Sequence, residues 1–290
     1  EKTKKAAILD SFVNNDPSLI SWNRSLKQDL LKGKSHQFEP RCMTISLYRP
    51  YTKQWLYFSR QLNDMVYQMP RIFPDSAAEN RLIMIKQRWS GQGQLALMVN
   101  RIPDLQSDGG SQCFPLYLYD DAPATSEQPQ QTGLFDAPTK PQRQRREAIT
   151  DQGLAHFLTA YPGEQIRKED LFYYVYGILH SPEYRERFAD NLSKELPRIP
   201  AVKNAVDFWA FSKAGRALAE LHLNYETVEP YPLTIEAKST LTDADYRVEK
   251  MKFAKKGDMS AVIYNHRITL KGIPEAAWDY VVNGKAALDW

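Results

Sequence analysis

Residues 120–147 constrain most strongly how this chain folds. They read DDAPATSEQPQQTGLFDAPTKPQRQRRE, and Pro, Gln, Thr and Asp are frequent among them. Such a composition buries too little apolar surface to offset the conformational entropy that is lost on ordering. The sequence therefore predicts a linker or mobile loop at 120–149, between an N-terminal mixed part, residues 1–119, and a C-terminal part, residues 150–290.

Strand patterns dominate the N-terminal part after an opening helical region. Residues 1–40 carry apolar residues at helical spacing, whereas residues 43–60 look extended or mixed. The short apolar runs 81–86 and 95–100 flank SGQG, which predicts a β-hairpin. A third strand is predicted at 114–119, after the turn sequence SDGGS.

Helical patterns dominate the C-terminal part. Apolar residues recur at i, i+3, i+4 and i+7 through 154–161 and again through 171–179. Ser181-Pro182-Glu183 has the residue types of a helix start, and Ser212 is predicted to cap a further helix.

The pattern changes again near the end of the chain. Residues 262–271 alternate between apolar and polar, which predicts a strand, and PEAAWDYVV predicts a last helix that ends at Asn283-Gly284. The predicted fold class is therefore α+β. A mixed β-sheet part is followed by a mainly helical part with a small C-terminal β element.

The composition is that of an ordinary soluble globular protein, with 42% hydrophobic and 25% charged residues. No apolar run reaches the roughly 18 residues of a membrane span. Cys42 and Cys113 lie far apart, which favours a reducing, cytoplasmic compartment without a disulfide framework. The histidines lack metal-ligand spacing, so no metal site is expected. The start has no Met and no signal core, which indicates a piece of a longer chain.

Charge is distributed unevenly, although the net charge is only +3. Residues 41–90 contain eight bases and three acids, whereas residues 101–140 contain two bases and six acids. A local basic patch on a near-neutral chain is typical of a surface that contacts phosphates. A plain solvated face has the same composition, so both interpretations stay open.

Residues 48–58, within the basic window, read YRPYTKQWLYF, and five of the eleven are aromatic. Most of these rings are expected in the core, because large rings are usually well buried. Arg49, Lys53 and Gln54 lie between the rings and are candidate contacts to phosphates or base edges. The competing interpretation is that these three side chains are simply solvated.

Side chains suited to base recognition surround the predicted hairpin. Arg pairs with guanine O6 and N7, and Asn or Gln pairs with adenine N6 and N7. The DNA-binding candidates near the hairpin and the SDGGS turn are Asn80, Arg81, Arg88, Gln92, Gln94 and Gln112. Arg267 and Lys271 are further candidates on the polar side of 262–271. The basic cluster that closes the linker, Arg143, Arg145 and Arg146, is a candidate flexible arm along the phosphate backbone. A solvated run of charges is the competing interpretation.

Sequence motifs of catalytic sites are absent from the chain. It contains no GxxxxGK[ST] phosphate loop and no GxSxG nucleophile elbow. It also lacks an Asn/Asp-Pro-Pro-Tyr/Phe stretch, and no Glu-x-Lys closely follows a Pro-Asp. Nothing in the sequence pairs two carboxylates into an acid–base couple. We therefore predict no catalytic residue in this chain and a role in binding or coupling.

Several blocks, in a fixed order from about residue 20 to the end, resemble one known family. YRPYTKQWLYF is similar to a signature that follows the catalytic half of many large N6-adenine methyltransferases. The blocks that resemble the C-terminal specificity region of Type ISP restriction–modification enzymes are NRLIMI, GGSQCFPLYLY, EDLFYYVYGILHSPEYRERFADNLSKELPRIP, DFWAFSKAGRALAELHLNYE, YRVEKMKFAKK and IYNHRITLKGIPEAAWDYVVNGKAALDW.

The resemblance implies a target recognition domain within one long polypeptide that serves in phage defence. The other parts of that polypeptide would be a nuclease, a helicase-like ATPase and an adenine methyltransferase. They would use S-adenosylmethionine, ATP and Mg, and no cofactor is expected in this chain. The domain itself is expected to bind double-stranded DNA, to pack on the methyltransferase domain and to be monomeric.

Two other functions stay open. A structural coupling module would connect the methyltransferase with the ATPase and nuclease parts and would make no base contacts. Large exposed apolar surface without an electropositive cleft would favour it. A nuclease would instead require clustered carboxylates that hold a divalent metal.

Overall fold

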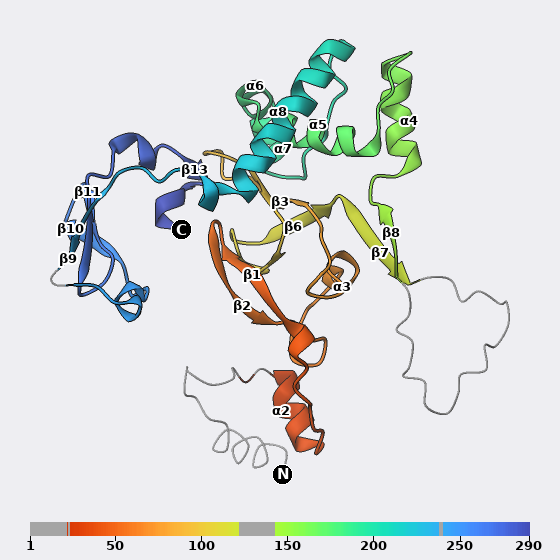
Figure 1. The fold of residues 1–290 in the computed structure, drawn as a ribbon. Coiled ribbons are helices and arrows are strands. Elements are labelled where there is room, and N and C mark those ends of the chain that lie inside the picture. Colours follow the sequence, from red (N-terminus) through yellow and green to blue (C-terminus); the bar gives the residue numbers. More distant parts are fainter. Residues whose placement is uncertain (1–21, 23, 122–142, 238–239) are drawn as a thin grey trace.

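The computed structural model describes residues 22, 24–121, 143–237 and 240–290. Small sheets come first along the chain, helices follow, and a four-stranded sheet lies near the C-terminal end (Figure 1). The predicted α+β class is therefore confirmed. Much of the helical region predicted at 1–40 falls outside the described residues; within it the structure describes helix α2 (Arg24–Leu31).

The remaining elements divide into two groups along the chain. The first group is η1 (Pro40–Cys42), β1 (Met43–Arg49), β2 (Thr52–Tyr57), α3 (Met69–Ile72), β3 (Leu82–Lys86), β4 (Ala96–Val99), β5 (Ile102–Pro103), β6 (Ser111–Pro115), β7 (Tyr117–Asp121) and β8 (Arg143–Glu147). The second group is α4 (Asp151–Ala160), α5 (Lys168–His180), α6 (Pro182–Arg187), α7 (Ala189–Leu192), α8 (Ala205–Leu223), η2 (Tyr225–Thr227), β9 (Thr234–Ala237), η3 (Asp243–Tyr246), β10 (Lys252–Lys255), β11 (Asp258–Ile263), β12 (Ile268–Lys271), η4 (Glu275–Trp278), β13 (Val281–Val282), β14 (Lys285–Ala286) and η5 (Ala287–Asp289).

In the central sheet, with strand order β4-β3-β6, strands β3 and β4 are buried on both faces. Ile83 and Ile85 of β3 belong to the hydrophobic cluster formed with the helices. Leu82 and Met84 belong to a second cluster on the other face, together with Leu47 of β1. A strand that is covered on both faces needs the continuous apolar run that β3 has.

The strand predictions for this part hold with one change. Residues 43–60 form the antiparallel pair β1 and β2, and the predicted hairpin is confirmed because β3 pairs antiparallel with β4. The single strand predicted at 114–119 is wrong, because β6 pairs with β3 whereas β7 pairs with β8. Leu116 is buried between β6 and β7, and the chain changes sheet at that residue.

Helices α5 and α8 pack closely against each other and cover one face of the central sheet (Figure 1). Their closest approach involves Gly215 of α8. A Cβ added at Gly215 would lie 2.0 Å from the carbonyl oxygen of Tyr173 in α5. Only glycine permits so short a distance between the two helix backbones.

The helix caps agree with the sequence at one of two positions. The Ser181 hydroxyl accepts the backbone N–H of Tyr184 and caps α6, as predicted. The cap predicted at Ser212 is wrong, because α8 begins at Ala205 after the cap residue Asn204. Ser212 is buried inside α8 and donates to a carbonyl oxygen of α5, so the hydroxyl joins two helices.

The C-terminal β element is larger than predicted, because it is a four-stranded sheet of order β10-β11-β12-β9. Residues 262–271 are not one strand but the end of β11, a turn and β12. Asn265 makes the turn. Its buried amide donates to two carbonyl oxygens of the segment before β10 and accepts two backbone N–H groups of the turn. The alternation of apolar and polar residues continues through the turn, so the sequence pattern did not indicate a turn there.

The last helix predicted over PEAAWDYVV is wrong beyond its first turn. Only Glu275–Trp278 is helical, and Val281–Val282 forms β13. Asn283 and Gly284, with φ of 49° and 85°, connect β13 to β14. Positive φ at both central residues is typical of the tight hairpin turn for which Asn-Gly is the preferred pair. The same dipeptide often ends helices, so the sequence permitted both interpretations.

A two-stranded ribbon flanks the linker predicted at 120–149. Strands β7 and β8 pair antiparallel along their whole length, so the ends of the predicted linker are strands. The part between them, residues 122–142, lies outside the described residues. The division of the chain at 120–149 stays a proposal.

Candidate nucleic-acid interface

The charged groups of the YRPYTKQWLYF segment already have partners within the chain. The Arg49 guanidinium donates to the Tyr48 carbonyl oxygen at 2.8 Å and lies 4.0 Å from the centre of the Tyr48 ring. The Lys53 ammonium lies 2.5 Å from the Glu226 carboxylate. Gln54 is exposed, and its side chain has no hydrogen-bond partner in the part of the chain that the structure describes.

The aromatic rings of this segment were predicted mostly in the core, and the structure places none of them fully there. Tyr51, Tyr57 and Phe58 are half-buried, whereas Tyr48 and Trp55 are exposed. Trp55 is 70% exposed on β2, which lies at the edge of its sheet. The β1–β2 hairpin therefore exposes the Trp55 ring beside Gln54.

Asn80 and Arg81 support the fold. Asn80 is buried, its amide donates to two carbonyl oxygens, and its oxygen accepts two backbone N–H groups. The Arg81 guanidinium donates to the Tyr173 hydroxyl at 2.6 Å and forms an ion pair with Glu220. These contacts join the start of β3 to β7, α5 and α8.

Residues 87–94, which we call the hairpin loop, connect β3 to β4 and are anchored in the protein. Trp89 is buried in the helical cluster, and its backbone N–H donates to the Leu192 carbonyl oxygen at 2.9 Å. Gly93 has φ of +71°, and an added Cβ would lie 2.2 Å from the Val281 carbonyl oxygen. The loop therefore rests on both the helices and the β13–β14 hairpin.

Further hydrogen bonds fix the second half of the hairpin loop. The backbone N–H of Asn283 donates to the Gln94 carbonyl oxygen at 2.9 Å, and that of Gly284 donates to the Gln92 carbonyl oxygen at 3.1 Å. The Gln94 side chain accepts a hydrogen bond from Arg185 of α6. The backbone and the side chain of Gln94 therefore both form hydrogen bonds within the chain, whereas Gln92 does so through its backbone.

The side chains of Arg88 and Gln92 are left exposed by these anchors. Neither has a hydrogen-bond or ion-pair partner among the described residues. Strand pairing places Gln112 of β6 opposite Ile85, immediately before Lys86 at the end of β3. Basic and amide side chains thus gather at one end of the central sheet.

The turn before β6 stiffens the same end of the sheet. Asp108 is buried there and accepts hydrogen bonds from the Ser111 hydroxyl at 2.5 Å and from the Asn283 amide at 2.8 Å. Burial raises the pKa of Asp108 above its ordinary value. The carboxyl group ties this turn to the β13–β14 hairpin that supports the hairpin loop.

Arg267 lies in the turn before β12, and Lys271 ends β12 in the four-stranded C-terminal sheet. Figure 1 shows β9, β10 and β11 of this sheet on the left, apart from β3. The Arg267 guanidinium lies 3.1 Å from the Asp245 carboxylate, and the Lys271 ammonium lies 2.9 Å from the Glu236 carboxylate. The structure therefore does not bring the eleven predicted DNA contacts together on one surface.

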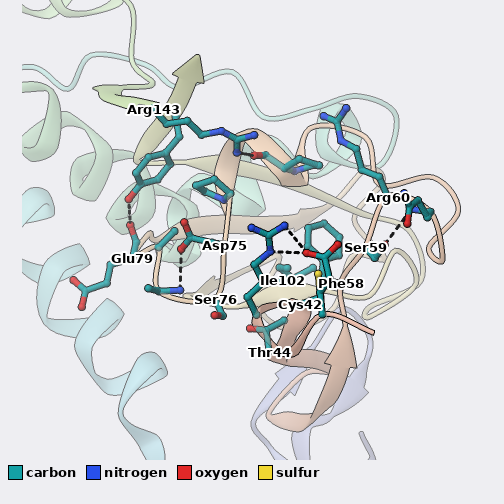
Figure 2. Close-up of a pocket in the computed structure, with 18 of the residues that line it drawn as sticks. Cys42, Thr44, Phe58, Ser59, Arg60, Asp75, Ser76, Glu79, Ile102 and Arg143 are labelled. Atoms are coloured by element: carbon teal, nitrogen blue, oxygen red, sulfur yellow. Dashed lines mark hydrogen bonds and ion pairs between the residues drawn. The ribbon is translucent and has the colours of Figure 1, made fainter. Parts of the chain in front are cut away.

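A second candidate surface escaped the sequence analysis as a unit. A cleft of about 840 Å³ lies between β1, the segment after β2, the segment before β3, and the β7–β8 ribbon. Figure 2 shows side chains that line it. Four arginines from three segments line this arginine cleft, namely Arg41, Arg60, and Arg143 and Arg145 of β8. The excess of bases in 41–90 and the basic cluster at the end of the linker were its only traces in the sequence.

In the ranges that the structure describes, no three His, Cys, Asp or Glu side chains gather in a way that suits a metal ion. No described helix combines the length and the apolar character that a membrane crossing requires. Cys42 and Cys113 are free thiols, and burial raises the pKa of Cys113 to about 12.

Solved structures of three proteins are similar to this chain over nearly its whole length. One is the ATP-dependent Type ISP restriction-modification enzyme LlaBIII bound to DNA, with 32% identity, a TM-score of 0.74, and 100% of this chain and 18% of that chain covered. Another is a nuclease-deletion mutant of the Type ISP enzyme LlaGI in complex with a DNA substrate mimic, with 34% identity, a TM-score of 0.70 and 99% and 20% covered. The third is a DrdV–DNA complex, with 33% identity, a TM-score of 0.75 and 98% and 26% covered.

This chain thus corresponds to 18–26% of the length of these solved proteins. A search among curated proteins finds no match. The family model of the Type ISP C-terminal specificity domain matches residues 1–290. The resemblance found in the sequence blocks is confirmed, and the chain belongs to the family of Type ISP C-terminal specificity domains.

Proposed function

We propose that this domain recognises the DNA target of a Type ISP restriction–modification enzyme and positions an N6-adenine methyltransferase on it. The observation that carries the proposal is the hairpin loop. It presents Arg88 and Gln92 to solvent from a backbone that helices and the β13–β14 hairpin hold in place. Relatives of known structure that are described as bound to DNA support the same reading.

The two exposed side chains suit direct reading of base pairs. Arg is the commonest partner of guanine in the major groove, and Gln pairs with adenine there. A loop that is fixed before binding loses little conformational entropy on binding. Contacts to phosphates position such a domain on DNA, and a few base contacts give it specificity.

The structure divides the sequence-derived candidates into two groups. Those with a free polar end among the described residues, which we propose as DNA contacts, are Gln54, Arg88, Gln92 and Gln112. Those engaged within the chain, which we assign to the fold, are Arg49, Lys53, Asn80, Arg81, Gln94, Arg267 and Lys271. A DNA contact by the second group would first have to break these interactions.

We further propose that the domain acts within a longer cytoplasmic polypeptide. The adjoining methyltransferase would use S-adenosylmethionine and would flip the target adenine out of the duplex. The ATPase and nuclease parts would use ATP and Mg. The specificity domain would supply no catalytic residue and no cofactor site, and it would act as a monomer.

A coupling module without base contacts is the second candidate, and exposed apolar side chains favour it. On one face of the C-terminal sheet, strand pairing aligns Phe253, Val262, Leu270 and Ile235 in a row. Ile235 is 57% exposed and Phe253 is 38% exposed. Apolar rows of this kind often mark contacts between protein domains.

Fluorescence anisotropy with random duplex DNA across a salt series tests the proposed function. We expect the logarithm of the binding constant to fall linearly with the logarithm of salt concentration, because bound Lys and Arg release counterions. Arg88→Ala should weaken binding, whereas Lys271→Ala serves as a matched loss of one positive charge elsewhere. Absence of binding at low salt, by the chain alone and by the chain joined to its methyltransferase, would leave the coupling module as the function.

A further inference from the structure

The arginine cleft has the size and position of a separate binding site. Its volume of about 840 Å³ falls in the range of roughly 300–1,000 Å³ that small-molecule sites occupy. Its lining includes Glu79, shortly before β3, whereas the hairpin loop follows the other end of β3. The cleft therefore lies at the opposite end of that strand from the proposed base-reading residues.

Weakly polar side chains line part of the cleft. Cys42, Thr44, Phe58 and Ile102 lie together there in Figure 2, and Pro70 and Pro74 add to the lining. Ile102 is buried, and Phe58 is half-buried with part of its ring exposed to the cleft. A planar heterocycle packs favourably on such a surface through stacking and apolar contact.

Guanidinium groups line one side of the cleft. Arg143 is fixed by its hydrogen bond to the Pro70 carbonyl oxygen at 2.8 Å and lies 3.3 Å from Asp121. Arg60 and Arg145 are exposed, and within the described part of the chain neither has a carboxylate partner. The Arg145 guanidinium lies 4.4 Å from the centre of the Tyr117 ring, a contact that leaves its N–H groups without a charged acceptor. Guanidinium groups without a carboxylate partner bind phosphate oxygens through two parallel hydrogen bonds.

Hydrogen-bond acceptors line another side. Figure 2 places Arg60 and Arg143 at the top of the view, and Asp75 and Glu79 lower and to the left. The Asp75 carboxylate accepts the backbone N–H of Ala77 at 3.0 Å. The Glu79 carboxylate is exposed and has no partner among the described residues. Such groups accept hydrogen bonds from amino and hydroxyl groups.

We propose that the arginine cleft binds a nucleoside phosphate. Arg60 and Arg145 hold the phosphate, the base packs over Phe58, and Glu79 accepts from an amino or hydroxyl group of the nucleoside. The nucleoside phosphate is either one unit of a DNA strand or a free nucleotide. The first source rests on the proposed function, whereas the second does not.

Two fluorescence titrations separate the two sources. The free-nucleotide titration uses the four N-methylanthraniloyl-labelled deoxynucleoside monophosphates. The strand titration uses single-stranded tetranucleotides that contain 2-aminopurine. The test variant is Arg60→Ala with Arg145→Ala, and the matched control is Lys203→Ala with Lys213→Ala, which removes two exposed positive charges at α8. Binding of random duplex DNA by anisotropy is measured in parallel.

We expect at least one titration to show saturable binding and the test variant to raise its dissociation constant tenfold or more. A charge-assisted hydrogen bond contributes about that factor to binding. The control variant should bind like the parent chain. No binding in either titration, or equal binding by the test variant, would overturn the cleft proposal, even if duplex binding is intact. Saturable binding in a titration, together with no binding of duplex DNA by the chain alone or joined to its methyltransferase, would instead contradict the proposed function.

Discussion

The hairpin loop and the arginine cleft lie beyond opposite ends of strand β3, and the protein builds them differently. The hairpin loop is one continuous segment that neighbouring elements hold from several sides. The cleft is assembled from segments far apart in the sequence, from Arg41 to Arg145. A fixed loop suits the reading of particular bases, whereas dispersed guanidinium groups suit a phosphate in any sequence context. The predictions below test whether the two surfaces are separable in this way.

The largest effect is expected from Gly93→Ala. The added Cβ would lie 2.2 Å from the Val281 carbonyl oxygen, and φ is +71°. Displacing this backbone should cost about 3 kcal/mol or more of unfolding free energy. In the Gly93→Ala variant, the further substitution Arg88→Ala should no longer weaken DNA binding. Chemical denaturation and anisotropy measure the two effects.

Gly91→Ala is the matched control for that substitution. Its φ of +83° also disfavours alanine, but no atom lies within 4 Å of the added Cβ. We expect a loss of about 1 kcal/mol. Equal losses for the two variants would show that contact with the β13–β14 hairpin does not fix the loop.

Acidification should loosen the hairpin-loop end before the cleft. His222 of α8 lies 3.0 Å from the hydroxyl of Tyr280, which precedes β13. Burial lowers the pKa of His222 to about 3 and that of His180 to about 4. In the unfolded chain both imidazoles bind protons near pH 6.5, their ordinary pKa. The stability that depends on their being neutral in the fold is therefore present above pH 6.5 and is lost as pH falls from 6.5 toward 3.

The loss should reach a few kcal/mol for each histidine. Amide hydrogen exchange is measured at pH 7 and pH 5 and expressed as protection factors, which correct for the slower intrinsic exchange at pH 5. Protection should fall more at pH 5 in residues 87–94 and 280–284 than in residues 58–61 of the cleft. His222→Gln should flatten the pH dependence, whereas the exposed His156→Gln should not. A uniform fall in protection across all segments would contradict the proposed link between His222 and the loop.

Arg88→Ala and Gln92→Ala should each cost about 1–3 kcal/mol of specific binding and should relax the preference for one base pair. The cleft variant Arg60→Ala with Arg145→Ala should leave that preference unchanged, because phosphate contacts carry no sequence information. Selection from a randomised duplex pool measures both. A change of preferred sequence in the cleft variant would show that the cleft and the hairpin loop both take part in sequence recognition.

The smallest effects are expected where the sequence-derived candidates form surface ion pairs. Lys53→Ala and Lys271→Ala each remove an exposed pair, with Glu226 and Glu236 respectively. Such pairs contribute about 0–1 kcal/mol to stability, and neither change should alter DNA binding by more than about twofold. A tenfold loss of DNA affinity would show that these lysines contact DNA.

The sequence was sufficient for what is local. The glycines of SGQG and the apolar runs beside them predicted the hairpin, and Ser181 predicted a cap. It was insufficient where a distant partner decides the role of a side chain. Arg81 is a suitable base-reading residue by type, but Glu220 of α8 binds its guanidinium. Asn265 lies in an alternating pattern, but its amide makes a turn.

The arginine cleft escaped prediction for the same reason. Arg60 and Arg145 are separated by most of the N-terminal part, and strand β8 enters the cleft only because it pairs with β7. No local spacing reports that pairing. The composition of 41–90 indicated a basic patch, but three-dimensional pairing decided which of its bases stay free.

The central claim is that the hairpin loop reads the base sequence of DNA. The most direct measurement is sequencing of duplexes selected from a randomised pool by the full-length protein that carries this domain and by its Arg88→Ala, Gln92→Ala variant. The account predicts that the selected sequence relaxes at one or two adjacent base pairs while the other positions keep their preference. An unchanged preference at every position would contradict it.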